Sequence, residues 1–161
     1  MNTQEQVSEA AAIGALYRLP TNVVPETYHI VLTPDLERFV FSGSETIHVR
    51  VREATNVIVI NANEVELQEA VLTDANGARL KGTVELDSEH EFAKITFASV
   101  IEAGKYDLQL QFTGEINDKL NGWYRSFYTH PTLGKRPMAT TQFETTDARK
   151  MFPCFDEHAF K

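Results

Sequence analysis

The chain has 161 residues, of which 42% are hydrophobic and 24% are charged. This length fits one domain with its own core, and the composition excludes a disordered or fibrous chain. The formal net charge is -8 at pH 7. That charge disfavours nucleic acid and anionic lipid as partners, because both require clustered Lys and Arg. An acidic balance is instead compatible with cationic ligands.

Residues 1–16 are polar and Ala-rich, and we expect them to form a flexible leader before one ordered domain at 17–161. They have neither the basic start nor the long apolar stretch of a secretory signal. No apolar run approaches the ~20 residues that a membrane-spanning helix needs. The single cysteine, Cys154, excludes an internal disulfide and favours a reducing compartment. We therefore expect a cytoplasmic protein with no membrane partner.

Apolar and polar residues alternate with a period of two along much of the chain, and almost no segment before Thr145–Lys150 favours a helix. Such alternation is typical of strands with one face on a core and the other in water. The sequence therefore predicts an all-β fold of roughly eight to ten strands, arranged as a twisted antiparallel β-sandwich or saddle. The clearest alternating segments are 28–33, 46–51 and 106–112.

Three local signals refine this prediction. Val57–Ile60 is apolar on both faces, which predicts a central strand covered on both sides. Asp74–Gly77 ends in Asn-Gly and predicts a tight hairpin turn, because Asn-Gly tolerates positive φ. Gly43 interrupts an alternating segment and is interpreted as a bulge or bend.

No motif for catalysis or metal binding is present. His90–Lys94 resembles a zinc-protease motif, but its fifth residue is a lysine, which is a cation at neutral pH, and it lies in strand-like sequence. There is no nucleophile elbow and no glycine loop that could hold phosphate. Cys154 lies between Pro153 and Phe155, and we interpret it as a buried, unreactive thiol. We predict no catalytic residue and no metal ligand in this chain.

Three segments in the last fifty residues are highly specific when they occur in this order: GEINDKLNGWYRS at 114–126, TQFETTDAR at 141–149 and FPCFDE at 152–157. Together with the start at Arg18-Leu19-Pro20, they closely resemble the N-terminal domain of the gluzincin aminopeptidases, the aminopeptidase N family. The wording of residues 114–126 is most similar to the puromycin-sensitive branch of that family. The resemblance covers about residues 17–161.

The resemblance implies a β-sandwich or saddle that precedes a thermolysin-like catalytic domain. It also implies that Gln142 and Glu144 bind substrate. The glutamate would help to hold the α-ammonium of a peptide, and the glutamine would line the first subsite. A charge-assisted hydrogen bond of this kind contributes about 1.5–3 kcal/mol, and in an extended segment the two side chains share a face. The pattern alone favours solvated side chains of an edge strand for both residues, and it is the surrounding motif that favours the binding role.

Two further expectations concern the residues after this pair. Arg149, Asp156 and Glu157 are predicted to form an ion-paired turn that holds the 141–144 segment. His158 stands where the family usually has proline, so we expect a looser final turn.

The family's GxMEN and HExxH motifs do not occur in this sequence. We therefore expect a fragment or truncated product without peptidase activity, whose zinc cofactor belongs to the catalytic domain of the parent enzyme. The expected partners are that catalytic domain, through an apolar patch near the C-terminal segment, and a peptide N-terminus, which this chain alone would bind weakly. The alternative is a stand-alone, non-catalytic peptide- or protein-binding module of the same fold.

Overall fold

A computed structural model describes residues 18–160, so the predicted leader at 1–16 lies outside the described residues. The described chain is almost entirely β-structure, with nine strands and two short 3₁₀ helices. The all-β prediction is confirmed, and the strand number falls within the predicted range. Thr145–Lys150 yields only one 3₁₀ turn, η1 (Ala148–Lys150).

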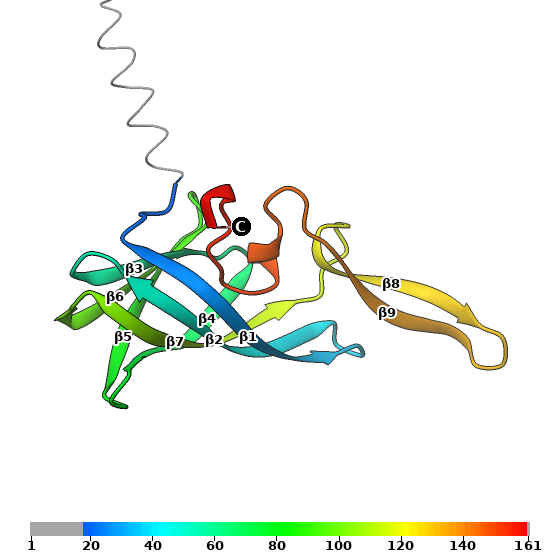
Figure 1. The fold of residues 1–161 in the computed structure, drawn as a ribbon. Coiled ribbons are helices and arrows are strands. Elements are labelled where there is room, and N and C mark those ends of the chain that lie inside the picture. The colour runs from blue at the N-terminus through cyan, green and yellow to red at the C-terminus, as the bar shows by residue number, and fades with distance from the viewer. Residues whose placement is uncertain (1–17, 161) are drawn as a thin grey trace, which may run out of the picture.

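Seven strands form one antiparallel sheet in the order β1-β2-β7-β4-β5-β6-β3, and β8 and β9 form a separate two-stranded hairpin that projects from the body (Figure 1). The bounds are β1 (Val23–Asp35), β2 (Val40–Val51), β3 (Thr55–Asn61), β4 (Val65–Asp74), β5 (Arg79–Asp87), β6 (Phe92–Ile101), β7 (Gly104–Glu115), β8 (Gly122–His130) and β9 (Gly134–Gln142).

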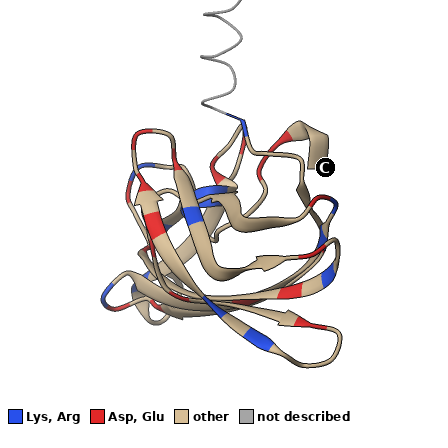
Figure 2. Cartoon of the chain, turned by 90° about the vertical axis from the view of Figure 1, so that its left-hand side faces the viewer, with Lys and Arg blue, Asp and Glu red and all other residues tan. Residues whose placement is uncertain are grey.

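The seven-stranded sheet curls strongly around its own inner face, as the end-on view in Figure 2 shows. The two facing halves of the predicted sandwich or saddle therefore belong to one continuous, curled sheet. In β2 the alternation is strict, with Ile47 and Val49 buried and His48 and Arg50 exposed. The period-two pattern of the sequence thus sets which face encloses the core. The largest fully buried side chains are Phe97, Phe112, Ile47, Ile58, Ile60, Leu72, Ile95, Ile101, Leu108, Leu110, Ile116 and Val49.

Gly43 does not mark a bulge, so that part of the prediction is wrong. The register of β2 runs unbroken through it against both neighbouring strands. Its cross-strand partner in β7 is Phe112, and a Cβ built on Gly43 would lie 2.3 Å from the Phe112 ring. In the next inward-facing pair the glycine is in β7 and the ring in β2. Phe41 lies opposite Gly114, and a Cβ built on Gly114 would lie 2.5 Å from the Phe41 ring. Glycine is needed at both positions because an aromatic ring occupies the space of the missing side chain.

We expect Gly43→Ala to destabilise the domain by about 1–3 kcal/mol, because the methyl group overpacks a ring that has 1% exposure. Urea unfolding followed by near-UV circular dichroism measures the change. Ser42→Ala, on the exposed face of the same strand, is the control and should stay within about 0.5 kcal/mol of the parent. Equal stability of Gly43→Ala and the parent would contradict the tight packing.

The prediction of a central strand at Val57–Ile60 is also wrong. These residues lie in β3, the last strand of the sheet, which pairs with β6 alone among the strands. Ile58 and Ile60 are buried in the core, whereas Val57 and Val59 are only half-buried. The sequence is apolar on both faces because the second face is partly covered. The predicted hairpin turn at Asp74–Gly77 is confirmed, since it joins β4 to β5 with Gly77 at φ +84°.

The two edges of the curled sheet are joined by residues 153–157, which we name the C-terminal strap. Asn61 at the end of β3 exchanges both backbone hydrogen bonds with Cys154, at 2.8 and 2.9 Å. On the other edge, the Tyr28 hydroxyl of β1 accepts a hydrogen bond from the Phe155 amide at 3.0 Å. The strap thus closes the gap that the curl leaves between β1 and β3.

Candidate functional site

Gln142 is the last residue of β9, and Glu144 lies two residues later in a turn. Both side chains are exposed, and neither takes part in a hydrogen bond or ion pair within residues 18–160. The extended segment expected here is incorrect, because the chain turns after Gln142 and the Asp147 amide donates to the Phe143 carbonyl at 3.0 Å. Gln142 is therefore positioned by the end of β9, and Glu144 by the turn that follows it.

The turn is held against the base of the hairpin. Gly122 of β8 is the cross-strand partner of Gln142 and has φ +63°. A Cβ on Gly122 would lie 2.8 Å from Cβ of Lys150, so the hairpin base and η1 are in close contact. Lys150 in turn forms an ion pair with Asp147 at 3.0 Å, with both side chains mostly buried. These contacts limit how far the Glu144 turn can move relative to β9.

Arg149 connects the turn to the strap. Its guanidinium donates to Oδ2 of Asp156 at 3.3 Å and to the Asp156 carbonyl at 3.1 Å. It also donates to Oε2 of Glu91 at 3.1 Å, in the turn before β6. The predicted pairing of Arg149 with Asp156 is confirmed. Glu157, however, forms no ion pair with Arg149 within residues 18–160 and instead accepts a hydrogen bond from the amide of Leu19.

Sequence reasoning missed two residues that organise this region. Glu91 precedes Arg149 by 58 positions, and no local pattern connects them. Asn61 is 1% exposed, and besides its backbone bonds to the strap its side-chain Oδ1 accepts from the Asp156 amide at 3.0 Å. A buried polar residue at the end of an apolar strand is a signal that could have identified Asn61, because such groups are almost always hydrogen-bonded.

At His158 the structure shows a second 3₁₀ turn, η2 (His158–Phe160), in place of the looser end expected from the missing proline. The Phe160 amide donates to the Glu157 carbonyl at 3.0 Å, and the rings of Phe155 and Phe160 lie 5.7 Å apart. A cavity of about 290 Å³ separates this end from the Glu144 turn, and its lining includes Thr145 and His158.

The residues of the zinc-protease-like segment have other contacts. Nδ1 of His90 lies 2.8 Å from a carboxylate oxygen of Asp87, and Glu91 contacts Arg149 and Asn63. Within residues 18–160, no group of three or more His, Cys, Asp or Glu side chains is arranged to hold a metal. The side chains present therefore do not fit the zinc of the aminopeptidases. Cys154 is 5% exposed, as predicted for a buried thiol.

In the described part of the chain, no helix is both long and apolar enough to cross a membrane.

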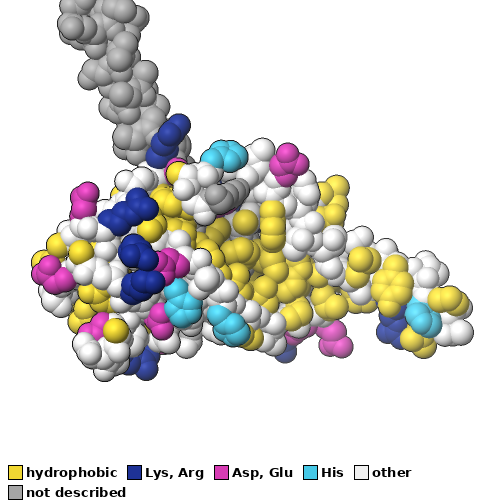
Figure 3. All heavy atoms as spheres, viewed as in Figure 1, with side chains coloured by type: hydrophobic (Ala, Val, Ile, Leu, Met, Phe, Trp, Pro, Cys, Tyr) yellow, Lys and Arg dark blue, Asp and Glu magenta, His cyan; other side chains and the backbone are white. Residues whose placement is uncertain are grey.

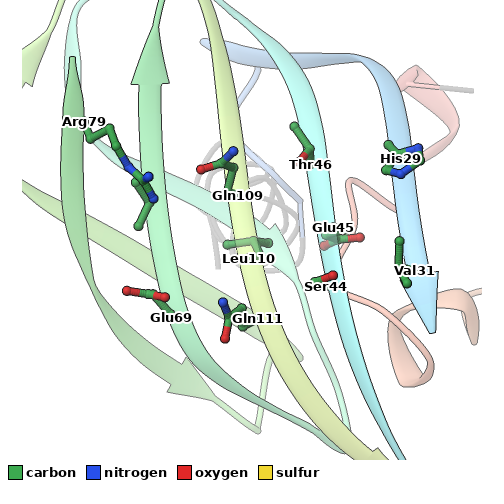
Figure 4. A pocket seen from close by; sticks show the side chains of 11 residues that line it. His29, Val31, Ser44, Glu45, Thr46, Glu69, Arg79, Gln109, Leu110 and Gln111 are labelled. Carbon is green, nitrogen blue, oxygen red and sulfur yellow. The ribbon is translucent and has the colours of Figure 1, made fainter. Parts of the chain in front are cut away.

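A polar groove of about 320 Å³ lies on the outer face of the sheet and does not include the predicted pair (Figure 4). Its side chains come from β1, β2, β4, β5 and β7, and include His29, Thr46, Glu69, Gln109 and Gln111.

Apolar side chains gather across the middle of the molecule and along the hairpin in the view of Figure 3. Near the C-terminal segment, the Phe152 ring lies 6.2 Å from the ring of Phe143 and 6.4 Å from that of Tyr28. Tyr28 is 37% exposed, and the two phenylalanines are half-buried. These three rings form a partly exposed aromatic cluster beside the strap.

The chain matches a known protein family over most of its length. Residues 24–161 match the model of the peptidase M1 N-terminal domain. The chain is 37% identical over 145 residues to puromycin-sensitive aminopeptidase of Caenorhabditis elegans, covering 89% of this chain. It is 38% identical to bovine aminopeptidase N over 163 residues, and 39% identical to aminopeptidase 2 of Candida albicans over 144 residues, covering 90% and 89% of this chain. The chain therefore belongs to the M1 peptidase family, as its N-terminal domain.

The match covers only a small part of each relative. The chain spans 15%, 16% and 15% of the length of these three proteins.

Proposed function

We propose that this domain anchors the N-terminus of a peptide substrate for a zinc aminopeptidase of the M1 family, in a cytoplasmic setting. In this proposal Glu144 accepts a hydrogen bond from the substrate α-ammonium, and Gln142 lines the first subsite. The observation that carries the proposal is that both side chains are exposed and unpartnered within residues 18–160, next to a turn that is itself firmly held.

The surroundings of Glu144 support this role on physical grounds. An exposed carboxylate without a cation in the described chain is free to accept an ammonium donor. The Lys150–Asp147 ion pair and the Arg149–Asp156 contacts hold the C-terminal side of the turn. A fixed carboxylate sets how far a peptide can enter, which is how an exopeptidase selects the first bond.

Zinc chemistry lies outside this role. In an M1 enzyme the metal supplies Lewis-acid activation of the scissile carbonyl and of water, and the side chains of this domain are not arranged to hold it. The residues of this chain would contribute substrate position alone. We therefore propose that the chain by itself has no peptidase activity. Turnover of an aminoacyl fluorogenic substrate that survives repurification and stops with a zinc chelator would contradict this.

A chimaera tests the anchoring role. This chain replaces the matching segment of the Caenorhabditis elegans puromycin-sensitive aminopeptidase, and steady-state kinetics are measured with aminoacyl fluorogenic substrates. We expect Glu144→Gln to lower kcat/KM by about 10- to 100-fold, because a charged hydrogen bond of about 1.5–3 kcal/mol is weakened.

Glu53→Gln is the matched control, because Glu53 is also exposed and has no ion pair in the described residues. It should leave kcat/KM unchanged. An active chimaera whose kcat/KM does not respond to Glu144→Gln would show that this carboxylate does not bind the substrate amine.

A further inference from the structure

The β8–β9 hairpin differs from the rest of the molecule in charge. No aspartate or glutamate occurs between Asp118 and Glu144, whereas the whole chain has a net charge of -8. The cations of the outer hairpin are Lys135 and Arg136, at the start of β9. Arg136 has no ion pair within residues 18–160, and Lys135 lies 4.2 Å from the centre of the Phe127 ring. Figure 3 shows basic and apolar side chains on the hairpin and no acidic ones.

The outer half of the hairpin is also apolar and uncovered. Tyr128 is 47% exposed, Leu133 at the tip 59% and Met138 38%. The base is attached to the body through Trp123, whose ring lies 5.0 Å from Phe41. Residues 128–136, however, make no hydrogen bond, ion pair or ring contact with the described residues outside the hairpin. A two-stranded ribbon is marginal in water without a covering surface, so this hairpin is a candidate docking element.

A complementary surface lies at the base of the same hairpin. A groove of about 650 Å³ is lined by four carboxylates and one guanidinium around an apolar strip. Glu115 in this groove faces Arg125 of β8 at 3.8 Å, which places the groove beside the hairpin base. Two more of its carboxylates are ion-paired, Asp35 with Arg38 at 3.6 Å and Glu64 with Lys119 at 3.1 Å. Glu66 is thus the one carboxylate of the groove without an ion pair in the described residues, and the nearby Val40 is 41% exposed. The charged residues of the groove are Asp35, Arg38, Glu64, Glu66 and Glu115.

The tip of a hairpin cannot reach the groove at its own base, because nine residues per strand extend about 30 Å. A second copy can reach it. When two hairpins lie side by side in opposite directions, each basic tip meets the acidic groove of the other copy, and both contacts form at once. This arrangement has two-fold symmetry and is closed, so it produces a dimer and not an open chain.

We propose that this chain forms a two-fold dimer in which the basic, apolar tip of each β8–β9 hairpin docks in the acidic groove at the base of the partner's hairpin. Charge complementarity sets the antiparallel orientation, and burial of the apolar residues on tip and groove supplies affinity. The inference is independent of the proposed substrate anchoring, because neither Gln142 nor Glu144 takes part in it.

Sedimentation velocity of the full chain, from micromolar to submillimolar concentration, tests the dimer. We expect a concentration-dependent monomer–dimer equilibrium that weakens as salt is raised, because exposed charges are screened. The double variant Lys135→Glu with Arg136→Glu should raise the dissociation constant by about tenfold or more. The control, Arg79→Glu with Lys81→Glu, makes the same charge change on exposed residues of β5 and should leave the constant unchanged.

A mixing experiment separates specific docking from general repulsion. Glu66→Lys alone should weaken the dimer, because two basic surfaces then meet. An equimolar mixture of Glu66→Lys with the hairpin double variant should recover a heterodimer, since both of its contacts again join opposite charges. Circular dichroism checks that each variant is folded.

A chain that stays monomeric at low salt throughout the concentration range would overturn the proposal, even if it bound anionic vesicles or a nucleic acid instead. A dimer that the hairpin and control variants weaken equally, or a mixture that fails to associate, would overturn it as well.

Discussion

Replacing Glu45 with leucine is expected to stabilise the domain by about 3 kcal/mol at pH 7. Glu45 is 4% exposed on the inner face of β2, opposite Ile30 and Leu110. Neither of its carboxylate oxygens has a hydrogen-bond partner. Burial raises the pKa of this carboxyl to about 9, from an ordinary value of 4.5. A charged carboxylate in this position is therefore much less stable than in the unfolded chain.

The sign of the pH dependence follows from the raised pKa. Below about pH 4.5, Glu45 is protonated in both the folded and the unfolded state and costs the fold nothing through ionisation. Between about pH 4.5 and 9 the folded state alone retains the proton, so this group lowers the free energy of unfolding by about 1.4 kcal/mol per pH unit. Above that range the loss is complete. The stability contributed by the proton is thus present at low pH and lost as pH rises.

Urea unfolding of the parent, Glu45→Gln and Glu45→Leu between pH 5 and pH 8 checks this expectation. Both variants should be more stable than the parent at pH 8 and should lose much of that advantage near pH 5, because neither side chain titrates. Glu53→Gln changes an exposed carboxylate outside the proposed docking surfaces; it serves as the control and should not change the pH profile. Parallel pH profiles for the parent and Glu45→Gln would show that Glu45 does not titrate in this range.

Replacing Arg149 with methionine is expected to destabilise the domain by about 3–5 kcal/mol, the usual cost of removing one member of a buried ion pair. The side chain of Asp156 is 3% exposed and that of Arg149 is 10% exposed, so water cannot replace the lost guanidinium. The substitution also removes the contacts of Arg149 with Glu91 and with the Asp156 carbonyl. Because these contacts join the Glu144 turn to the strap, both segments should become more mobile.

Thermal unfolding and amide hydrogen exchange measure the two effects. Exchange should accelerate at Asn63, whose amide donates to the Arg149 carbonyl at 3.0 Å, and at Asp147. The double variant Arg149→Met with Asp156→Asn should recover part of the stability, because the buried carboxylate is then neutral. Unchanged stability of Arg149→Met would contradict the coupling. A double variant whose loss of unfolding free energy equals the sum of the losses of the two single variants would contradict it as well.

Much of the fold follows from local patterns in the sequence. The alternation in β2 and β7 correctly predicts which residues face the core, because one buried face imposes a period of two. Asn76-Gly77 correctly predicts a hairpin turn, since positive φ is a local requirement. The resemblance to the family rests on three motifs whose order is visible without a structure, and the family model matches residues 24–161.

The errors arise where a residue responds to a distant neighbour. Gly43 looked like a bulge, but the ring of Phe112, 69 positions later, occupies the space beside it. β3 looked central, but it is an edge strand next to Cys154 of the strap. Glu45 lies in an ordinary alternating strand, and only the curl of the sheet reveals that its carboxylate is buried without a partner.

The sequence by itself determined the all-β class, the inward face of the strands, the Asn-Gly turn, the family and the candidate pair Gln142 and Glu144, because each depends on residues close together in the chain or on motif order. Tertiary structure alone decided the strand order, the closure of the sheet by the strap, and the contact of Arg149 with Glu91, which is 58 positions away. Such contacts depend on how the whole sheet curls, and they cannot be predicted from local periodicity because the residues that meet share no pattern along the chain.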